Sequence, residues 1–126
     1  MTKHHYYELA GFQNVYLEDS FVFEIHESVS KFVLHMEVVL NEQHPFYTSP
    51  KSSEQYCYKK AAIIFTDVET VEWEEKNFKR YPDANGEYDY GNIDTFYLVD
   101  GYYYLAGDWG RVKIKATGIN LNFQHP

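Results

Sequence analysis

The sequence predicts an all-β fold, mainly antiparallel, either a single-domain β-sandwich or a partly open barrel, with a four-stranded C-terminal meander. Three observations carry this prediction. Aromatic residues, which favour strands, make up 19% of the chain. Apolar and polar residues alternate over most of its length, which is the period of a half-buried strand. The dipeptides Asp100-Gly101 and Thr117-Gly118 separate alternating segments and are typical of two-residue hairpin turns.

The length of 126 residues fits one domain spanning 1–126, and 44% hydrophobic with 24% charged residues indicates a globular chain. The longest apolar runs, such as 61–65, are too short to span a bilayer, and no apolar secretory signal follows Met1. Cys57 is the single cysteine, so no intramolecular disulfide can form. We therefore expect no membrane contact and a reducing compartment, most simply the cytoplasm, with a processed secreted form left open.

The N-terminal half predicts a hairpin whose two strands are joined through residues 28–31. Its apolar residues are odd-numbered in the first strand and even-numbered in the second: Val15, Leu17, Phe21, Phe23 and Ile25, then Phe32, Leu34, Met36, Val38 and Leu40. The register that follows pairs Ile25 with Leu34, Phe23 with Met36 and Phe21 with Val38.

Two more segments occupy the middle of the chain. Residues 56–65 alternate as a strand. Residues 68–79 are ambiguous, because Val68, Val71 and Glu75 also fit helical spacing, with Asp67 placed to cap a helix. The β-branched residues and Trp73 favour a strand.

Residues 93–124 predict the meander, with turns at Asp100-Gly101, at 107–110 and at Thr117-Gly118. All three turns place the same ten residues on one face, because side chains alternate with period two. These are Phe96, Leu98, Tyr103, Leu105, Val112, Ile114, Ala116, Ile119, Leu121 and Phe123.

Two long connections, 41–55 and 77–92, complete the chain. Loops of this length in compact domains are often functional. They carry Phe46, Tyr47, Tyr88 and Tyr90, which have no predicted core position.

Oxygen-bearing side chains in the second connection suggest a weak calcium site. Asp83, Asn85, Glu87, Asp89 and Asp94 are the candidate ligands. The glycine and the acidic residues do not follow EF-hand spacing, and Asn-Gly is equally typical of a turn. We therefore expect no metal to bind tightly there.

A second metal candidate lies on the N-terminal hairpin. Glu24, His26, His35 and Glu37 share its predicted outer face, and Glu24 lies across from His35. Two imidazoles and a carboxylate can hold zinc, but a Glu–His pair is also ordinary cross-strand stabilisation.

No catalytic or cofactor-binding motif is present. The chain lacks a nucleophile elbow, a phosphate-binding glycine loop and a zinc-protease motif. Cys57 lies on a predicted strand, where cysteine packs as a small hydrophobe. The sequence therefore does not favour an enzyme and indicates no cofactor.

The most distinctive surface is the outer face of the meander. It carries Tyr97, Tyr102 and Tyr104 beside Arg111 and Lys113, with Lys115 next to them. Tyrosine and arginine are enriched where proteins meet, so these residues are the candidate partner-binding site. Whether another layer covers this face stays open.

The net charge of −8 arises from 19 acidic and 11 basic residues. It would repel phosphate backbones, so we expect no nucleic-acid partner. It would attract a basic protein partner.

The stretches 16–20, 54–58, 83–94 and 107–110 resemble a family of small bacterial proteins of unknown function. The resemblance covers nearly the whole chain and implies no activity or site. In size and charge the chain is also similar to immunity proteins that neutralise toxins. We expect a non-enzymatic protein-binding module, an inhibitor or immunity protein among the options. The alternatives are a small-molecule or divalent-metal binder, or an enzyme with an unrecognised site.

Overall fold

The computed structural model describes residues 2–52, 54–82 and 88–124 and shows an antiparallel β protein, as predicted. Its elements are β1 (His4–His5), the 3-10 helix η1 (Tyr6–Glu8), β2 (Val15–Glu27), β3 (Lys31–Leu40), β4 (Cys57–Lys76), β5 (Tyr81–Pro82), β6 (Tyr88–Asp89), β7 (Ile93–Val99), β8 (Tyr102–Gly107) and β9 (Gly110–Phe123). Within the described ranges, no helix has the length and apolar character needed to cross a membrane.

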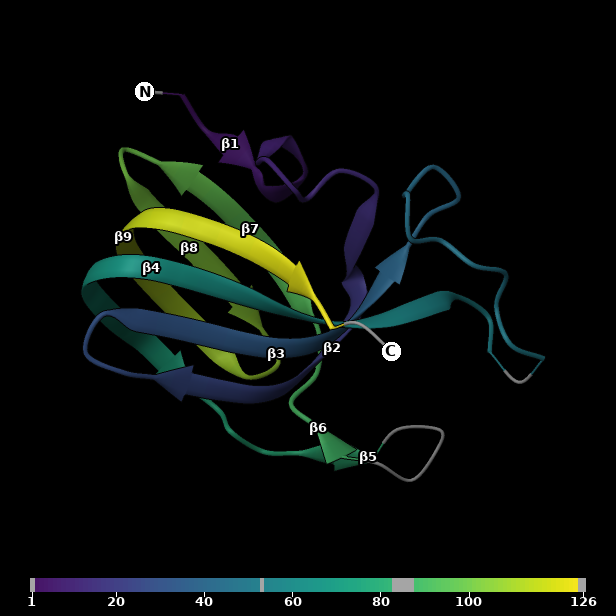
Figure 1. Ribbon diagram of the computed structural model, residues 1–126. Helices are drawn as coiled ribbons and strands as arrows, with labels where there is room; N and C mark the ends of the chain where they lie inside the picture. The colour runs from purple at the N-terminus through teal and green to yellow at the C-terminus, as the bar shows by residue number, and fades with distance from the viewer. Residues whose placement is uncertain (1, 53, 83–87, 125–126) are drawn as a thin grey trace.

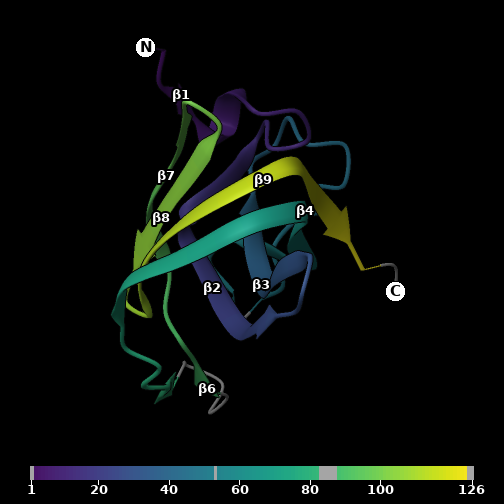
Figure 2. The same ribbon diagram turned by 90° about the vertical axis from the view of Figure 1, so that its left-hand side faces the viewer.

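Seven strands form one sheet in the order β1-β7-β8-β9-β4-β3-β2, and β5 pairs with β6 in a separate ribbon. The sheet rolls around its own core, with β4 and β9 curving across the molecule (Figures 1 and 2). Its two edges approach each other where the Val22 N–H donates to the Gly91 carbonyl and the Tyr90 N–H donates to the Val22 carbonyl, both at 2.8 Å. One rolled sheet that is not closed corresponds to the predicted partly open barrel, and not to a sandwich of two sheets.

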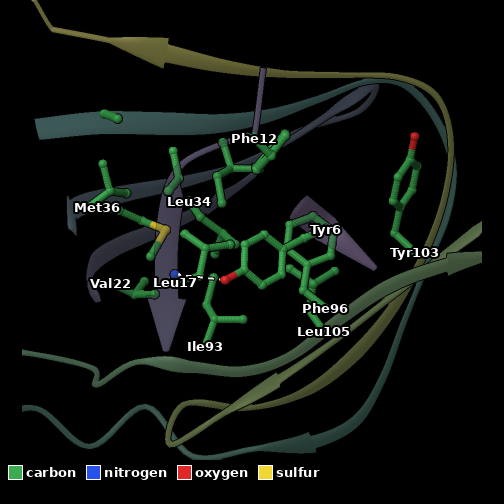
Figure 3. Close-up of a cluster of buried hydrophobic side chains, with 14 of the residues drawn as sticks. Tyr6, Phe12, Leu17, Val22, Leu34, Met36, Ile93, Phe96, Tyr103 and Leu105 are labelled. Atoms are coloured by element: carbon green, nitrogen blue, oxygen red, sulfur yellow. Dashed lines mark hydrogen bonds between the residues drawn. The ribbon is translucent and has the colours of Figure 1, made fainter. Parts of the chain in front are cut away.

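The core fills the inside of the rolled sheet. Its largest fully buried side chains are Trp109, Phe12, Phe32, Phe65, Leu17, Leu34, Met36, Ile63, Ile93, Leu105, Ile114 and Val22. Figure 3 shows the Tyr6 hydroxyl reaching Leu17, whose N–H donates to it at 3.3 Å, and the same hydroxyl donates to Glu18 at 2.6 Å. Burial and the hydrogen bond to Glu18 raise the pKa of Tyr6. Since η1 follows the edge strand β1 and Glu18 lies in the opposite edge strand β2, Tyr6 ties the two edges together.

The first two predicted turns of the meander are confirmed. Asp100 and Gly101 have φ values of 52° and 80°, the positive values that a type I′ turn requires. Gly107 pairs with Gly110 at the next turn. The predicted cross-strand pairs are present: Phe96 with Leu105, Tyr97 with Tyr104, Leu98 with Tyr103, Val99 with Tyr102, Leu105 with Val112 and Tyr103 with Ile114.

The predicted third turn, at Thr117-Gly118, is wrong. β9 runs through both residues as one strand of 14 residues, paired with β4, so the meander has three strands and not four. All ten residues predicted on one face nevertheless pack in or against the core. The reason is that β9 changes phase within the strand: inward side chains are even-numbered in 112–116 and odd-numbered in 119–123. A hairpin and a change of phase leave the same pattern in a sequence.

The change of phase is shared with β4. Phe65 pairs with Ile119 and Val68 pairs with Ala116, on either side of Asp67, which has a φ of 50°. The two longest strands therefore change the face they present to the core at the same place.

Replacing Gly118 by alanine is expected to lower the free energy of unfolding by about 1–3 kcal/mol, as overpacking does. The added Cβ would lie 2.4 Å from Oγ1 of Thr66, whereas Gly118 does not have a positive φ. The double variant Thr66→Ala/Gly118→Ala should therefore recover most of the loss relative to Thr66→Ala alone. Urea unfolding of the four proteins in this double-mutant cycle measures the recovery. A loss that persists without the Thr66 side chain would point to a backbone requirement at Gly118 and contradict this explanation.

The N-terminal hairpin turns where predicted, with the Ser28 N–H donating to the Lys31 carbonyl at 2.9 Å. Next to the turn, Ile25 pairs with Leu34, also as predicted.

Farther from the turn the predicted register of this hairpin is wrong. Met36 pairs with Val22 in place of Phe23, and Phe21 pairs with Glu37, one residue from its predicted partner. The cause is a pair of register shifts in β2. A bulge sets two residues opposite one, so the alternation slips to the other face. Val22 is consequently fully buried, whereas Phe21 and Phe23 are only half-buried.

The segment 68–79, which fitted either a helix or a strand, is a strand as far as Lys76, as its β-branched residues and Trp73 indicated. The two predicted middle strands are one continuous strand, β4, of 20 residues. No strand lies in the described part of the connection 41–56, which joins β3 to β4, and β5 and β6 lie in the connection 77–92. Tyr47 and Tyr90 pack against the core, which the sequence did not predict.

Candidate functional site

The five residues predicted to bind a partner lie together on the outer side of β7, β8 and β9. We call Tyr97, Tyr102, Tyr104, Arg111 and Lys113 the tyrosine face. Its three tyrosines alternate with core residues and are half-exposed, so they are neither buried in a second core nor fully solvated.

The rings of the tyrosine face are held in place by cross-strand neighbours. Tyr97 pairs with Tyr104 and Tyr104 with Lys113. The Tyr97 and Tyr104 rings stack, with centroids 5.1 Å apart and planes inclined by 15°. The Lys3 Nζ lies 4.0 Å from the Tyr97 centroid, and the Lys113 Nζ lies 4.3 Å from the centroid of Tyr102. Aromatic stacking and cation–π contacts therefore order these side chains before any partner arrives.

Two lysines beside the rings already have acidic neighbours in β4. The Lys113 Nζ lies 3.9 Å from Glu72 Oε2, and the Lys115 Nζ lies 3.3 Å from Glu69 Oε2. The pKa of Lys113 is raised, chiefly by its hydrogen bond to the side chain of Tyr104, with Glu72 adding to the effect. Exposed ion pairs contribute little stability, so they serve mainly to orient the lysines.

A shallow pocket of about 310 Å³ opens beside the stacked rings. It is lined by Tyr97 and Tyr104 together with Thr95, Glu74 and Arg111. In the described part of the chain neither the Arg111 side chain nor the Glu74 side chain has a hydrogen bond or an ion pair. The pocket thus offers an incoming group two flat rings, one guanidinium and one carboxylate, and neither charged group has a side-chain partner among the described residues.

The candidate calcium ligands are only partly described, because Asp83, Asn85 and Glu87 lie outside the described residues. Asp89 is buried, and its Oδ1 accepts a hydrogen bond from the Gly91 N–H at 2.8 Å. Asp94 is exposed and accepts from the Asn92 side-chain amide at 2.9 Å. Of the residues that the structure describes, no three His, Cys, Asp or Glu side chains form a group that could hold a metal ion.

The second metal candidate is only partly assembled. Glu24 pairs with His35 and His26 pairs with Val33, both in the predicted register, so His26 lies diagonal to His35. Glu37 lies opposite Phe21, on the far side of the register shift. These four residues do not form a group that could hold a metal ion, and the described residues contain no such group elsewhere.

Cys57 is buried in the core, as expected for a small hydrophobe. Its sulfur accepts a hydrogen bond from the Thr48 N–H at 3.4 Å. Cys57 therefore helps to hold the connection 41–56 against β4.

Sequence reasoning missed a second surface, where this connection meets the end of β9. His44, Phe46 and Phe123 pack there beside Lys59. One signal was present: Lys59 has the same odd numbering as the core residues of its strand, Ala61 and those that follow.

Neither a family model, a curated protein nor a solved structure matches this chain.

Proposed function

We propose that this protein is a non-enzymatic binding module for another protein, of the inhibitor or immunity type, and that the tyrosine face is its contact surface. The observation that carries the proposal is the half-exposed Tyr97–Tyr104 stack beside Arg111, whose guanidinium has no partner among the residues that the structure describes. Binding energy in protein interfaces concentrates in a few tyrosine, tryptophan and arginine anchors. Here the anchors stand on a sheet and are already ordered, so little side-chain entropy is lost on binding.

Charge supports a basic partner. The chain carries a net charge of −8, which accelerates association with a positively charged protein. Added salt screens this attraction and should slow the association. At close range Glu74, whose carboxylate has no partner in the described ranges, can accept hydrogen bonds from a basic group. Arg111 can donate to a carboxylate or stack on an aromatic ring.

The double variant Tyr97→Ala/Tyr104→Ala is expected to weaken capture of the partner while changing the melting temperature little. Loss of a central aromatic anchor costs about 2 kcal/mol or more, which is roughly thirtyfold in Kd. Proteins retained from an extract of the source organism by immobilised wild-type chain are identified by mass spectrometry, purified and titrated calorimetrically against both chains.

The matched control is Tyr16→Ala/Tyr88→Ala, which removes two tyrosines that are 51% and 59% exposed and lie outside the tyrosine face. The control should bind like the wild type. Equal binding by both double variants would place the contact elsewhere. Unfolding of the Tyr97→Ala/Tyr104→Ala protein would show that these rings belong to the core, and would refute the proposal for this face.

A further inference from the structure

A second pocket lies at one end of the rolled sheet, where the connection 41–56 meets the C-terminal end of β9. This is the side on which β9 ends in Figure 1. The pocket has a volume of about 250 Å³, and its apolar walls come from Pro45, Phe46, Tyr47 and Phe123. None of its lining residues belongs to the tyrosine face, so the two sites are separate.

Two of the aromatic residues that line this pocket, Phe46 and Phe123, pack against each other and against His44. The ring centroids of His44, Phe46 and Phe123 lie 5.1 to 5.5 Å from one another. The His44 Nδ1 accepts a hydrogen bond from the Phe46 N–H at 3.0 Å, which requires that nitrogen to be unprotonated. Burial lowers the pKa of His44, which agrees with a neutral ring.

Among the described residues that line the pocket, Lys59 is the one that is charged. It pairs with the fully buried Val38 and stands in the row of β4 that faces the core, between Cys57 and Ala61. A lysine in an inward-facing row loses part of its hydration, which favours a nearby anion. In the described part of the chain the Lys59 side chain has no ion pair, hydrogen bond or ring contact.

We propose that this pocket binds a small carboxylate whose body is a single aromatic ring. The walls of Phe46 and Phe123 match a ring, and the Lys59 ammonium supplies the counter-charge for the carboxylate. The volume is below the range of about 300–1,000 Å³ that is typical of pockets for drug-sized ligands, so it suits one ring and a short acidic tail.

The test uses three probes of one shape: 3-phenylpropionate, 3-phenylpropanol and 3-phenylpropylamine. Each is titrated at millimolar concentration into the full chain, and binding is followed by amide and aromatic chemical shifts in NMR spectra. We expect the acid to bind at least about tenfold more tightly than the alcohol, the size expected for a hydrogen bond to a charged group, and the amine to bind more weakly still. The largest shifts should occur at Phe46, Lys59 and Phe123.

Two lysine variants decide whether the charge comes from Lys59. Lys59→Met keeps an apolar stem but removes the charge. It should weaken binding of the acid by about tenfold or more, and should leave binding of the alcohol and the melting temperature unchanged. The matched control is Lys60→Met, in the next residue, whose ammonium lies 5.9 Å from the Phe23 ring. It should bind all three probes like the wild type.

Four results would overturn the proposal: no binding of the acid, equal binding of acid and alcohol, equal losses in both lysine variants, or shifts centred on the tyrosine face. None of these results bears on the capture experiment with Tyr97 and Tyr104, so the two proposals fail independently.

Discussion

Replacing Trp109 by alanine is expected to lower the free energy of unfolding by about 3–5 kcal/mol, the usual cost of truncating a buried aromatic side chain. Trp109 is fully buried and packs edge-on against Trp73, with centroids 5.9 Å apart. Its Nε1–H donates to the Asn92 carbonyl at 2.9 Å, so truncation also removes the partner of that carbonyl. Because whole domains are stable by only about 5–15 kcal/mol, this single change removes a large share of the total.

Urea unfolding followed by circular dichroism measures the loss. Trp109→Phe is the comparison, since it keeps most of the apolar surface and removes the hydrogen bond. It should cost about 1–3 kcal/mol, clearly less than Trp109→Ala. If Trp109→Ala changed stability by less than about 1 kcal/mol, the ring would not be part of the core.

Replacing Gly107 by alanine is expected to cost about 3 kcal/mol or more, at the upper end of overpacking effects. A Cβ at this position would lie 2.0 Å from the Asn92 carbonyl oxygen and 2.7 Å from Nε1 of Trp109. The first of these is a backbone atom, which cannot rotate away as the end of a side chain can. The hairpin of β8 and β9 would have to move off the start of β7, which would disturb the strands that carry the tyrosine face.

Gly101→Ala is the matched control for this experiment, because it isolates backbone strain from steric overlap. Gly101 has a φ of 80°, but nothing lies within 4 Å of a Cβ built there. Its replacement should cost about 1–2 kcal/mol, the strain of a left-handed conformation. Urea midpoints and slopes of the two variants give both values. A Gly107→Ala protein as stable as Gly101→Ala would contradict the close approach to Asn92.

Local chemistry was enough to predict the C-terminal hairpins. The Asp100-Gly101 turn and the alternation around it depend on neighbouring residues, so the register that brings Tyr97 opposite Tyr104 followed directly. The same alternation placed Arg111 on the outer side with the tyrosines. The residues of the candidate site were therefore predictable, but the pocket beside them was not.

Contacts between distant segments decided the rest. Thr117-Gly118 has the local chemistry of a turn, but β4 is long enough to pair with the whole of β9, and continued pairing satisfies the backbone without a reversal. Trp109 sits in a turn, and turns usually lie at the protein surface. It is nevertheless fully buried, because it packs against Trp73 and donates to the Asn92 carbonyl, both of which belong to other segments of the chain.

The sequence by itself determined the all-β class, the inward faces of β3, β7 and β8, and the residues of the tyrosine face, because alternation and turn conformation act over a few neighbouring residues. Only the tertiary structure decided how the sheet rolls, where β2 and β9 change phase, and that Lys59 shares a pocket with Phe46 and Phe123. The physical reason is that bulges and close approaches depend on the neighbouring strand. The alternation of residues within one strand does not show which strand pairs with it.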